Sequence, residues 1–346
     1  MTDQTPPGPP TGPPPHVQVM QMIMATLPSR VLATLSELAI PDALGAQARS
    51  AAEVAEAIGA YEPWVGRLMR AAASLGVLRV LDDGRFQNTP LGDALRSDTP
   101  NSVRSLGVLV NQPFHFLGWI ELAAGIRSGE VPFERVHGRT FFEHLGQDAD
   151  ANAKFAAWMT QTSIASNSAI VAAYDFTGAR VIMDVGGGQG ALLAATLGVA
   201  PRATGVLFDT PEVVTDVSAL ASAGVEERCR VVGGDFFDSV PSGADLIMLK
   251  TVIHDWDDGD SARILRRCRE CIADAQTRLL IIEMVLPDEP SPHPGFLMDI
   301  NMMVLNHGGR ERTQSEYVSL LADADFSFTR LVKTAGPLSI IEAAPS

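Results

Sequence analysis

The stretch Val181-Ile-Met-Asp-Val-Gly-Gly-Gly-Gln-Gly-Ala-Leu-Leu193 decides the fold. Its first five residues suit a buried strand, the glycines permit a sharp turn, and the Ala/Leu-rich residues after them suit a helix. Glycines between a strand and a helix let the backbone approach a ligand closely, and the free amides of the helix start face the same place. The stretch therefore predicts a cofactor cradle.

The spacing of these glycines indicates the class of cofactor. A dinucleotide fingerprint has the form G-x-G-x-x-G, whereas here glycines fall at Gly186, Gly188 and Gly190, with Gly187 between them. This form is similar to the first motif of S-adenosylmethionine-dependent methyltransferases. A glycine-rich turn is also simply a turn, so the downstream sequence has to decide between the two interpretations.

Composition excludes several classes of protein. The 346-residue chain is long enough for two domains, and its net charge of −15 argues against nucleic acid or an anionic membrane as partner. No apolar run reaches the roughly 18 residues that span a bilayer, and the N-terminus lacks the features of a secretory signal. Three cysteines cannot form a disulfide framework, which suits the cytoplasm. Cys268 and Cys271 share an apolar helical face and are expected in the core rather than at a metal.

The chain divides into four predicted segments. Residues 1–16 are proline-rich and predict a disordered tail, and residues 17–105 predict a helical, winged-helix dimerisation domain. Residues 106–174 are expected to form a helical connection that roofs a substrate pocket, and residues 175–346 a cofactor-binding domain.

The winged-helix layout rests on local signals. An amphipathic helix runs from Val17 to Ile40 with an interruption around Pro28, and its methionine-rich stripe is either ordinary packing or a contact with a partner subunit. Ser50-Ala-Ala-Glu53 fits a capping box, a second helix covers 64–75, and residues 77–86 read as a hairpin. Such a module binds DNA or dimerises. The acidic chain, with only Arg67 and Arg70 on the second helix, favours dimerisation.

From Val181 onwards strands alternate with helices, which predicts a doubly wound α/β domain whose ligands lie beyond the carboxyl ends of its strands. The expected strands are 181–185, 204–208, 229–233, 245–250, 278–284, 326–333 and 338–343.

Polar residues follow these strand ends in an order that fits one adenosyl ligand. Asp209, 23 residues after Gly186, ends the second strand and can accept both ribose hydroxyls. After the third strand, Asp235 can accept from an adenine amino group while Phe236 covers the ring. The alternative makes Asp235 a turn residue and Phe236 part of the core. Agreement of three strand ends favours the ligand.

A single histidine follows the fourth strand. His254 suits a general base because it lies just past a strand tip on the ligand side of the sheet. Glu283 at the fifth strand end and Glu311 further on can orient the imidazole and raise its basicity if they converge on it. Otherwise they are surface acids. No carboxylate cluster indicates a metal.

The motifs Asp-Val-Gly-Gly-Gly-x-Gly, Gly-Asp-Phe-Phe, His-Asp-Trp-Asp-Asp and Gly-Gly-Arg-Glu-Arg-Thr, in this order, resemble small-molecule O-methyltransferases of the caffeate, hydroxyindole and bacterial polyketide-tailoring type. The resemblance covers the chain after its tail. It implies a class I methyltransferase domain, S-adenosylmethionine as cofactor, and a homodimer formed by the N-terminal domain.

The resemblance also implies roles for single residues. His254 matches the base, and Glu283 and Glu311 match its supporting acids. The positions that match cofactor contacts are Gly186, Gly188, Asp209, Asp235, Phe236 and Lys250, the last through its backbone. Those that match acceptor contacts are Asp255, Met302, Asn306, Phe155 and Met159. Gln189, Thr210 and Glu212 depart from the commoner pattern, which bears on pocket shape.

The resulting hypothesis is an SN2 methyl transfer in which His254 takes the proton of an aromatic hydroxyl. Two alternatives remain open at the level of sequence. One is a relative that keeps the scaffold and cofactor but catalyses hydroxylation, decarboxylation or rearrangement. The other is a ligand-responsive winged-helix regulator.

Overall fold

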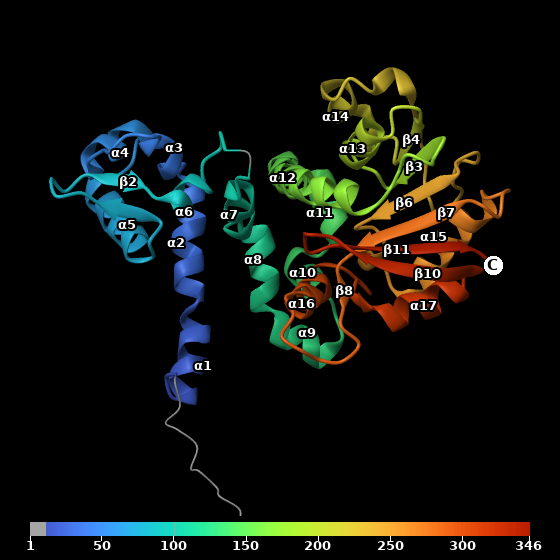
Figure 1. Cartoon of the computed structure of the whole chain (residues 1–346). Coiled ribbons are helices and arrows are strands. Elements are labelled where there is room, and N and C mark those ends of the chain that lie inside the picture. Colours follow the sequence, from blue (N-terminus) through green and yellow to red (C-terminus); the bar gives the residue numbers. More distant parts are fainter. Residues whose placement is uncertain (1–11, 100) are drawn as a thin grey trace, which may run out of the picture. The chain divides into compact units, whose positions relative to one another are not determined.

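The structure, a computed structural model, describes residues 12–99 and 101–346. The chain forms two compact units, Met1–Gln112 and Pro113–Ser346 (Figure 1). Each unit has its own buried core.

Two of the expected segments can be compared with these units. The tail predicted over residues 1–16 lies outside the described residues as far as residue 11, whereas Pro15 and His16 already belong to the first helix. The stretch 106–174, expected as one helical connection, is divided, because its part up to residue 112 belongs to the first unit and the remainder to the second.

The first unit consists of helices and one small hairpin. Its elements are α1 (Pro15–Met24), α2 (Thr26–Glu37), α3 (Ile40–Leu44), α4 (Ala51–Ile58), α5 (Glu62–Ser74), β1 (Leu78–Val80), β2 (Phe86–Asn88), α6 (Pro90–Asp93) and α7 (Arg104–Val110). The expected hairpin is present, because β1 and β2 pair antiparallel around a turn at Gly84. The predicted capping box is also present, with both Ser50–Glu53 bonds formed.

The interruption of the first predicted helix lies earlier than expected. α1 ends at Met24 and α2 begins at Thr26, so the break falls at Ala25 rather than around Pro28. A proline inside a helix lacks an N–H donor, and its ring clashes with the carbonyl four residues before it. Pro28 avoids both costs by lying in the first turn of a new helix.

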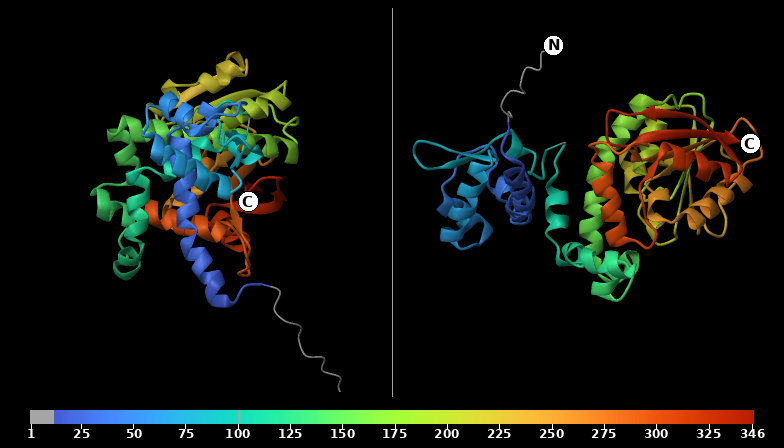
Figure 2. Two further views of the ribbon diagram at one scale, coloured as in Figure 1. Left: turned by 90° about the vertical axis from the view of Figure 1, so that its left-hand side faces the viewer. Right: turned by 90° about the horizontal axis from the view of Figure 1, so that it is seen from below.

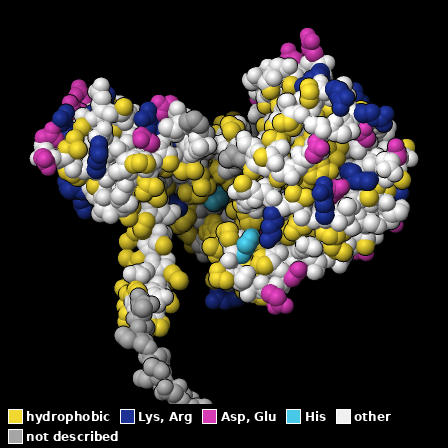
Figure 3. Space-filling view, in the orientation of Figure 1, with side chains coloured by type: hydrophobic (Ala, Val, Ile, Leu, Met, Phe, Trp, Pro, Cys, Tyr) yellow, Lys and Arg dark blue, Asp and Glu magenta, His cyan; other side chains and the backbone are white. Residues whose placement is uncertain are grey.

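α1 buries none of its residues in the single chain. Figure 3 shows hydrophobic side chains along this helix. The large apolar side chains exposed on α1 and at the start of α2 are Val19, Met20, Met22, Ile23, Met24 and Leu27. Within the described part of one chain, the methionine-rich stripe is therefore not the ordinary packing that was one of its two interpretations.

The second unit begins with a helical layer that is rich in aromatic residues. Its helices are α8 (Pro113–Ile120), α9 (Leu122–Ser128), α10 (Pro132–His137), α11 (Phe141–Gln147) and α12 (Ala149–Ala173). Phe133 of α10 and Phe155 of α12 both make edge-to-face contacts with Phe141 of α11. These contacts join the short helices to the long α12.

The sheet has seven strands in the order β10-β11-β7-β6-β3-β4-β5. They are β3 (Val181–Val185), β4 (Thr204–Asp209), β5 (Cys229–Gly233), β6 (Leu246–Lys250), β7 (Arg278–Glu283), β10 (Phe326–Lys333) and β11 (Ser339–Pro345). β3 to β7 are parallel, while β11 pairs antiparallel with both β7 and β10. In Figure 2, β10 and β11 lie side by side in red. The predicted strands and doubly wound fold are confirmed, with boundaries within two residues.

Helices cover both faces of this sheet. The elements between the strands are α13 (Ala191–Val199), η1 (Val213–Thr215), α14 (Ser218–Ser222), η2 (Glu226–Arg228), η3 (Ile253–Asp255), α15 (Asp258–Glu270), β8 (Val285–Leu286), α16 (Gly295–Leu305), β9 (Arg312–Thr313) and α17 (Gln314–Ala322). α12 and α13 contribute to the core on one face, and α15 and α17 to the core on the other. Cys268 is buried in the second core with Cys271 packed against it, as predicted.

The strand order reverses between β3 and β6, since the chain moves from β3 outward to β5 and then returns to β6. In open α/β sheets, ligands bind beyond the carboxyl ends of the strands at such a reversal. The glycine turn and the segment that carries His254 follow these two strands and so flank this point. Among the described residues, no helix is long and apolar enough to cross a membrane.

Candidate active site

The glycine turn after β3 is held tightly on one side and open on the other. Gly186, Gly188 and Gly190 have φ values of 68°, 58° and 85°, which L side chains rarely adopt. A Cβ on Gly186 would lie 2.7 Å from a methyl carbon of Val252, whereas one on Gly188 would meet nothing within 4 Å. The turn thus presents backbone to open space, as a ligand cradle requires.

Asp209 lies at this turn. Its Oδ2 accepts the Gly188 N–H at 2.8 Å and its Oδ1 accepts the Thr210 N–H at 2.7 Å. Burial raises the pKa of the Asp209 carboxyl, while these two hydrogen bonds lower it. The structure therefore brings the predicted ribose-binding acid together with the glycine turn.

Asp235 and Phe236 follow β5 and show features of both interpretations given above. Asp235 Oδ1 accepts the Phe237 N–H at 2.7 Å, which is the turn role. Phe236 packs against the core, but its ring edge also lies close to Gly186, 3.9 Å from where a Cβ would stand. The ring is therefore beside the turn, and its contact with a cofactor stays a prediction.

The backbone that carries His254 is held by Glu283 at the end of β7. One carboxylate oxygen, Glu283 Oε1, accepts the N–H groups of Val252 at 3.0 Å, Ile253 at 2.9 Å and His254 at 3.4 Å. Glu283 is fully buried, so these donors replace the water that its charge would otherwise bind. The sequence analysis assigned Glu283 to the imidazole only, and this backbone role was missed.

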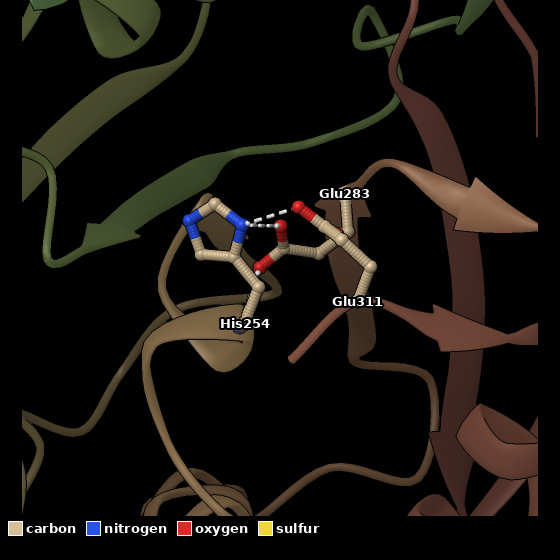
Figure 4. Close-up of side chains that lie close together, drawn as sticks. All are labelled: His254, Glu283 and Glu311. Atoms are coloured by element: carbon tan, nitrogen blue, oxygen red, sulfur yellow. Dashed lines mark hydrogen bonds and ion pairs between the residues drawn. The ribbon is translucent and has the colours of Figure 1, made fainter. Parts of the chain in front are cut away.

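The two glutamates converge on the imidazole, as Figure 4 shows. His254 Nδ1 lies 3.0 Å from Glu311 Oε1 and 3.6 Å from Glu283 Oε2. Both glutamates are buried, which contradicts the alternative of surface acids. Because the carboxylates face Nδ1, that nitrogen carries the hydrogen and Nε2 is the one left to accept a proton.

The charges of this cluster act on one another. Burial lowers the pKa of His254, but the carboxylates of Glu283, Asp255 and Glu311 together raise it to about 10. Burial raises the pKa of Glu283, against the lowering effect of the imidazole. Burial also raises the pKa of Asp255 to about 6. With a pKa of about 10, the imidazole is largely protonated at neutral pH.

In the described part of the chain, one group of side chains could hold a metal ion, namely His254, Glu283 and Glu311. Their ligand atoms lie within 4.8 Å of one another. The contacts present already account for this spacing. Glu311 is at hydrogen-bond distance from Nδ1, and Glu283 Oε1 is engaged by backbone donors. We therefore retain the interpretation of a base with two supporting acids.

The predicted acceptor residues are only partly brought together. Asn306 Nδ2 donates to Asp255 Oδ1 at 2.9 Å, and that oxygen lies 3.9 Å from His254 Nε2. Met302 is buried on α16. Phe155 and Met159 lie on α12, where the ring contacts of Phe155 are with Phe141 and Trp158.

The Lys250 side chain has a place that the sequence did not predict. Its Nζ donates to Ser163 Oγ at 3.1 Å and to Asn167 Oδ1 at 2.8 Å, both on α12. Burial lowers the pKa of Lys250 to about 8, although Asp184 and Glu283 raise it. The expected backbone contact of Lys250 with the cofactor stays a prediction.

Arg312 is a second residue that the sequence analysis missed. It is fully buried and donates to the carbonyls of Ile253 at 3.0 Å and Trp256 at 2.8 Å. It also bonds Asp258 at 2.9 Å and Ser261 at 3.2 Å. The motif Gly-Gly-Arg-Glu-Arg-Thr contained this arginine, but nothing in its spacing distinguished it from the half-exposed Arg310.

Comparisons with known proteins agree with this geometry. A family model for the O-methyltransferase domain matches residues 119–327, and one for the O-methyltransferase dimerisation domain matches residues 20–98. This chain belongs to the O-methyltransferase family. It is an S-adenosylmethionine-dependent O-methyltransferase, and the predicted family, activity and cofactor are confirmed. The relatives support neither a non-methylating enzyme nor a regulator.

Similar proteins match over nearly the whole chain. O-demethylpuromycin-O-methyltransferase of Streptomyces alboniger is 39% identical, over 95% of this chain and 89% of that protein. The crystal structure of LaPhzM is 36% identical with a TM-score of 0.90, covering 96% of this chain and all of that one. An O-methyltransferase from neocarzinostatin biosynthesis, in complex with S-adenosylmethionine and 2-hydroxy-5-methyl naphthoic acid, is 31% identical with a TM-score of 0.78, covering 92% and 96%.

We predict that Arg312→Met destabilises the second unit. The change removes the hydrogen bonds from the guanidinium to the carbonyls of Ile253 and Trp256, and a hydrogen bond to a charged group contributes about 1.5–3 kcal/mol. Urea unfolding should show a free energy of unfolding lower by at least about 2 kcal/mol. Arg310→Met is the matched control, because Arg310 is half-exposed and its ion pairs with Asp258 and Glu316 are worth under about 1 kcal/mol. An equal loss in both variants would contradict the prediction.

Proposed function

We propose that this O-methyltransferase methylates a hydroxyl group of a small aromatic metabolite, with His254 as general base. The observation that carries this proposal is the imidazole whose Nδ1 faces two buried carboxylates. The structure in complex with 2-hydroxy-5-methyl naphthoic acid supports a flat aromatic acceptor. The aromatic helical layer around Phe141 and Phe155 suits such a molecule.

The residues at the strand ends fit S-adenosylmethionine. The open side of the glycine turn at Gly188 leaves room for it, and Asp209 at that turn can accept from its ribose. Asp235 would accept from its adenine amino group and Phe236 would cover the adenine ring. Lys250 would contact the cofactor through its backbone. When bound, this cofactor supplies a methyl group on a positively charged sulfur. The chain's own part is to hold this group and the acceptor in line, because alignment contributes much of the rate enhancement.

The protein's chemical task is to remove a proton from the acceptor. An unperturbed phenol has a pKa of about 10, so little of it is ionised at neutral pH. His254 Nε2 accepts this proton while Glu311 and Glu283 stabilise the imidazolium that forms. Asp255, fixed by Asn306, faces the same nitrogen and would contact the acceptor. Met302, Phe155 and Met159 would complete the wall around it.

We expect His254→Ala to lose turnover by about 10²–10⁴-fold, the usual contribution of a positioned base. Transfer of labelled methyl from S-adenosylmethionine to a panel of phenols, catechols and hydroxyquinones measures this loss. Binding of the cofactor, followed by calorimetry, should persist. His293→Ala is the matched control. His293 lies before α16, where its Nδ1 accepts a hydrogen bond from the Gly295 N–H. Full turnover by His254→Ala would exclude His254 as the base.

The raised pKa of His254 predicts a rate that increases with pH. The imidazole must be unprotonated to accept a proton, and its pKa of about 10 leaves only a small unprotonated fraction at pH 7. The value of kcat/KM for the acceptor should therefore rise above neutrality, by at most about tenfold per pH unit. The positively charged sulfur of bound S-adenosylmethionine would shift this rise to lower pH, because a nearby positive charge disfavours the imidazolium. A flat profile between pH 6 and 9 in the wild type would contradict this prediction.

We also propose that two chains form a homodimer through the first unit. The dimerisation model covers residues 20–98, which include most of the exposed α1 stripe. An apolar helix face without a partner in its own chain is typical of an interface. The net charge of −15 disfavours nucleic acid or an anionic membrane as partner, and three free cysteines suit the cytoplasm.

Ile23→Asp should dissociate this dimer. Ile23 is 69% exposed in the single chain, so a charge there costs the monomer little but is unfavourable in an apolar interface. Sedimentation velocity should show a monomer for Ile23→Asp and a dimer for the wild type. Gln18→Asp on the same helix is the control, because Gln18 is polar and exposed already. A dimer that persists in Ile23→Asp would place the interface elsewhere.

A further inference from the structure

The side chain of Lys250 joins two parts of the second unit that are far apart in sequence. Lys250 ends β6, and its Nζ donates to Ser163 and Asn167, more than eighty residues earlier on α12. Asn167 is buried, and Lys250 is half-buried. A partly buried ammonium is unfavourable unless it is paired, so this arrangement is specific rather than incidental.

Two carboxylates stabilise the same ammonium. The negative charges of Asp184 on β3 and Glu283 on β7 both raise the pKa of Lys250, and these strands lie on either side of β6. Asp184 is buried beneath the glycine turn, since a Cβ on Gly187 would lie 2.8 Å from its carboxyl carbon. Its Oδ2 has no hydrogen-bond partner among the described residues. Lys250 thus ends the strand that lies between the strand carrying Asp184 and the strand carrying Glu283.

The partners of Lys250 on α12 belong to one side of that helix. Ser163 and Asn167 are four residues apart, and the same spacing continues backwards to Met159 and Phe155. Residues four apart are neighbours on a helix surface. α12 is continuous from Ala149 to Ala173, so a displacement at Ser163 carries along the helix to Met159.

We propose that Lys250 is a positioning residue that holds α12, and with it Phe155 and Met159, in place relative to the cofactor turn and the catalytic base. The proposal rests on the function proposed above. It gives Lys250 a task that its backbone contact with the cofactor would not supply. The ammonium contacts no reacting atom in this role, and acts through Ser163 and Asn167.

The test uses variants of Asn167, because these leave Lys250 and the cofactor turn unchanged. Asn167→Leu removes the oxygen that accepts from Lys250, whereas Asn167→Asp retains one. Losing a hydrogen bond to a charged group changes an equilibrium constant by roughly tenfold or more. We expect Asn167→Leu to raise the KM of the acceptor by about tenfold, with a smaller change in kcat and in cofactor affinity. Asn167→Asp should restore KM to within about twofold of the wild type.

A double-mutant cycle distinguishes this role from general loss of structure. If Lys250 acts through Asn167, adding Lys250→Met to Asn167→Leu should raise KM little further, because both changes remove one interaction. Ser168→Ala is the control on the same helix, since Ser168 is exposed and its hydroxyl donates to the Ile164 carbonyl within α12. If Lys250→Met does not fold, the Asn167 pair alone decides the matter.

The outcomes separate this inference from the proposed function. An unchanged KM in Asn167→Leu, or an equal fall of kcat and cofactor affinity with no rescue by Asn167→Asp, would overturn the role of Lys250 while wild-type turnover stands. Absence of turnover in the wild type across the acceptor panel would instead contradict the proposed function. A raised KM with rescue supports both.

Discussion

The site depends on one buried carboxylate, that of Glu283. Its Oε1 holds three backbone N–H groups of the segment after β6, while its Oε2 faces the imidazole of His254. The position of His254, the proposed base, and its electrostatic environment therefore both depend on this side chain. Because Glu283 ends an interior strand of the sheet, this segment is tied directly to the sheet. A flexible loop would not hold an imidazole so well.

Burying this much charge is unfavourable by itself, and the structure offsets it in several ways. The imidazole opposes Glu283 and Glu311, backbone donors occupy Glu283 Oε1, and Arg312 satisfies two carbonyls of the same segment. Removing one member leaves the others unpaired, so each is expected to matter for stability as well as for activity. The raised pKa of His254 follows from the same crowding, which makes a strong base and a pH-dependent one.

Much of the fold was predictable because the interior strands, such as β3, β6 and β7, are buried on both faces. Such strands read as short apolar runs, and the polar residue after each run marks the ligand side, as for Asp209 and His254. Glu283 could be recognised from its place at a strand end, whereas the role of Glu311 was implied only by the family motif and the convergence of both acids on His254 stayed open. Arg312 and the Lys250 side chain were not predictable, because their partners lie far away in sequence and no periodicity connects them. The predicted position of the helix break was too late in the chain. The ring of Pro28 would clash with the carbonyl four residues before it, so the break falls upstream, at Ala25.

The two halves of the site are built differently, and this difference bears on specificity. Residues for the cofactor follow strand ends, where backbone geometry leaves little freedom, as at Gly188 and Asp209. Most of the residues proposed for the acceptor come from α12 and the α16 region, where side chains can change size without disturbing the sheet, while Asp255 follows β6. A family can therefore keep one cofactor while its acceptors diversify. The helices must then be held at a fixed distance from the sheet, and the proposed role of Lys250, which is bonded to α12 from the end of β6, meets that requirement without a contact to the acceptor.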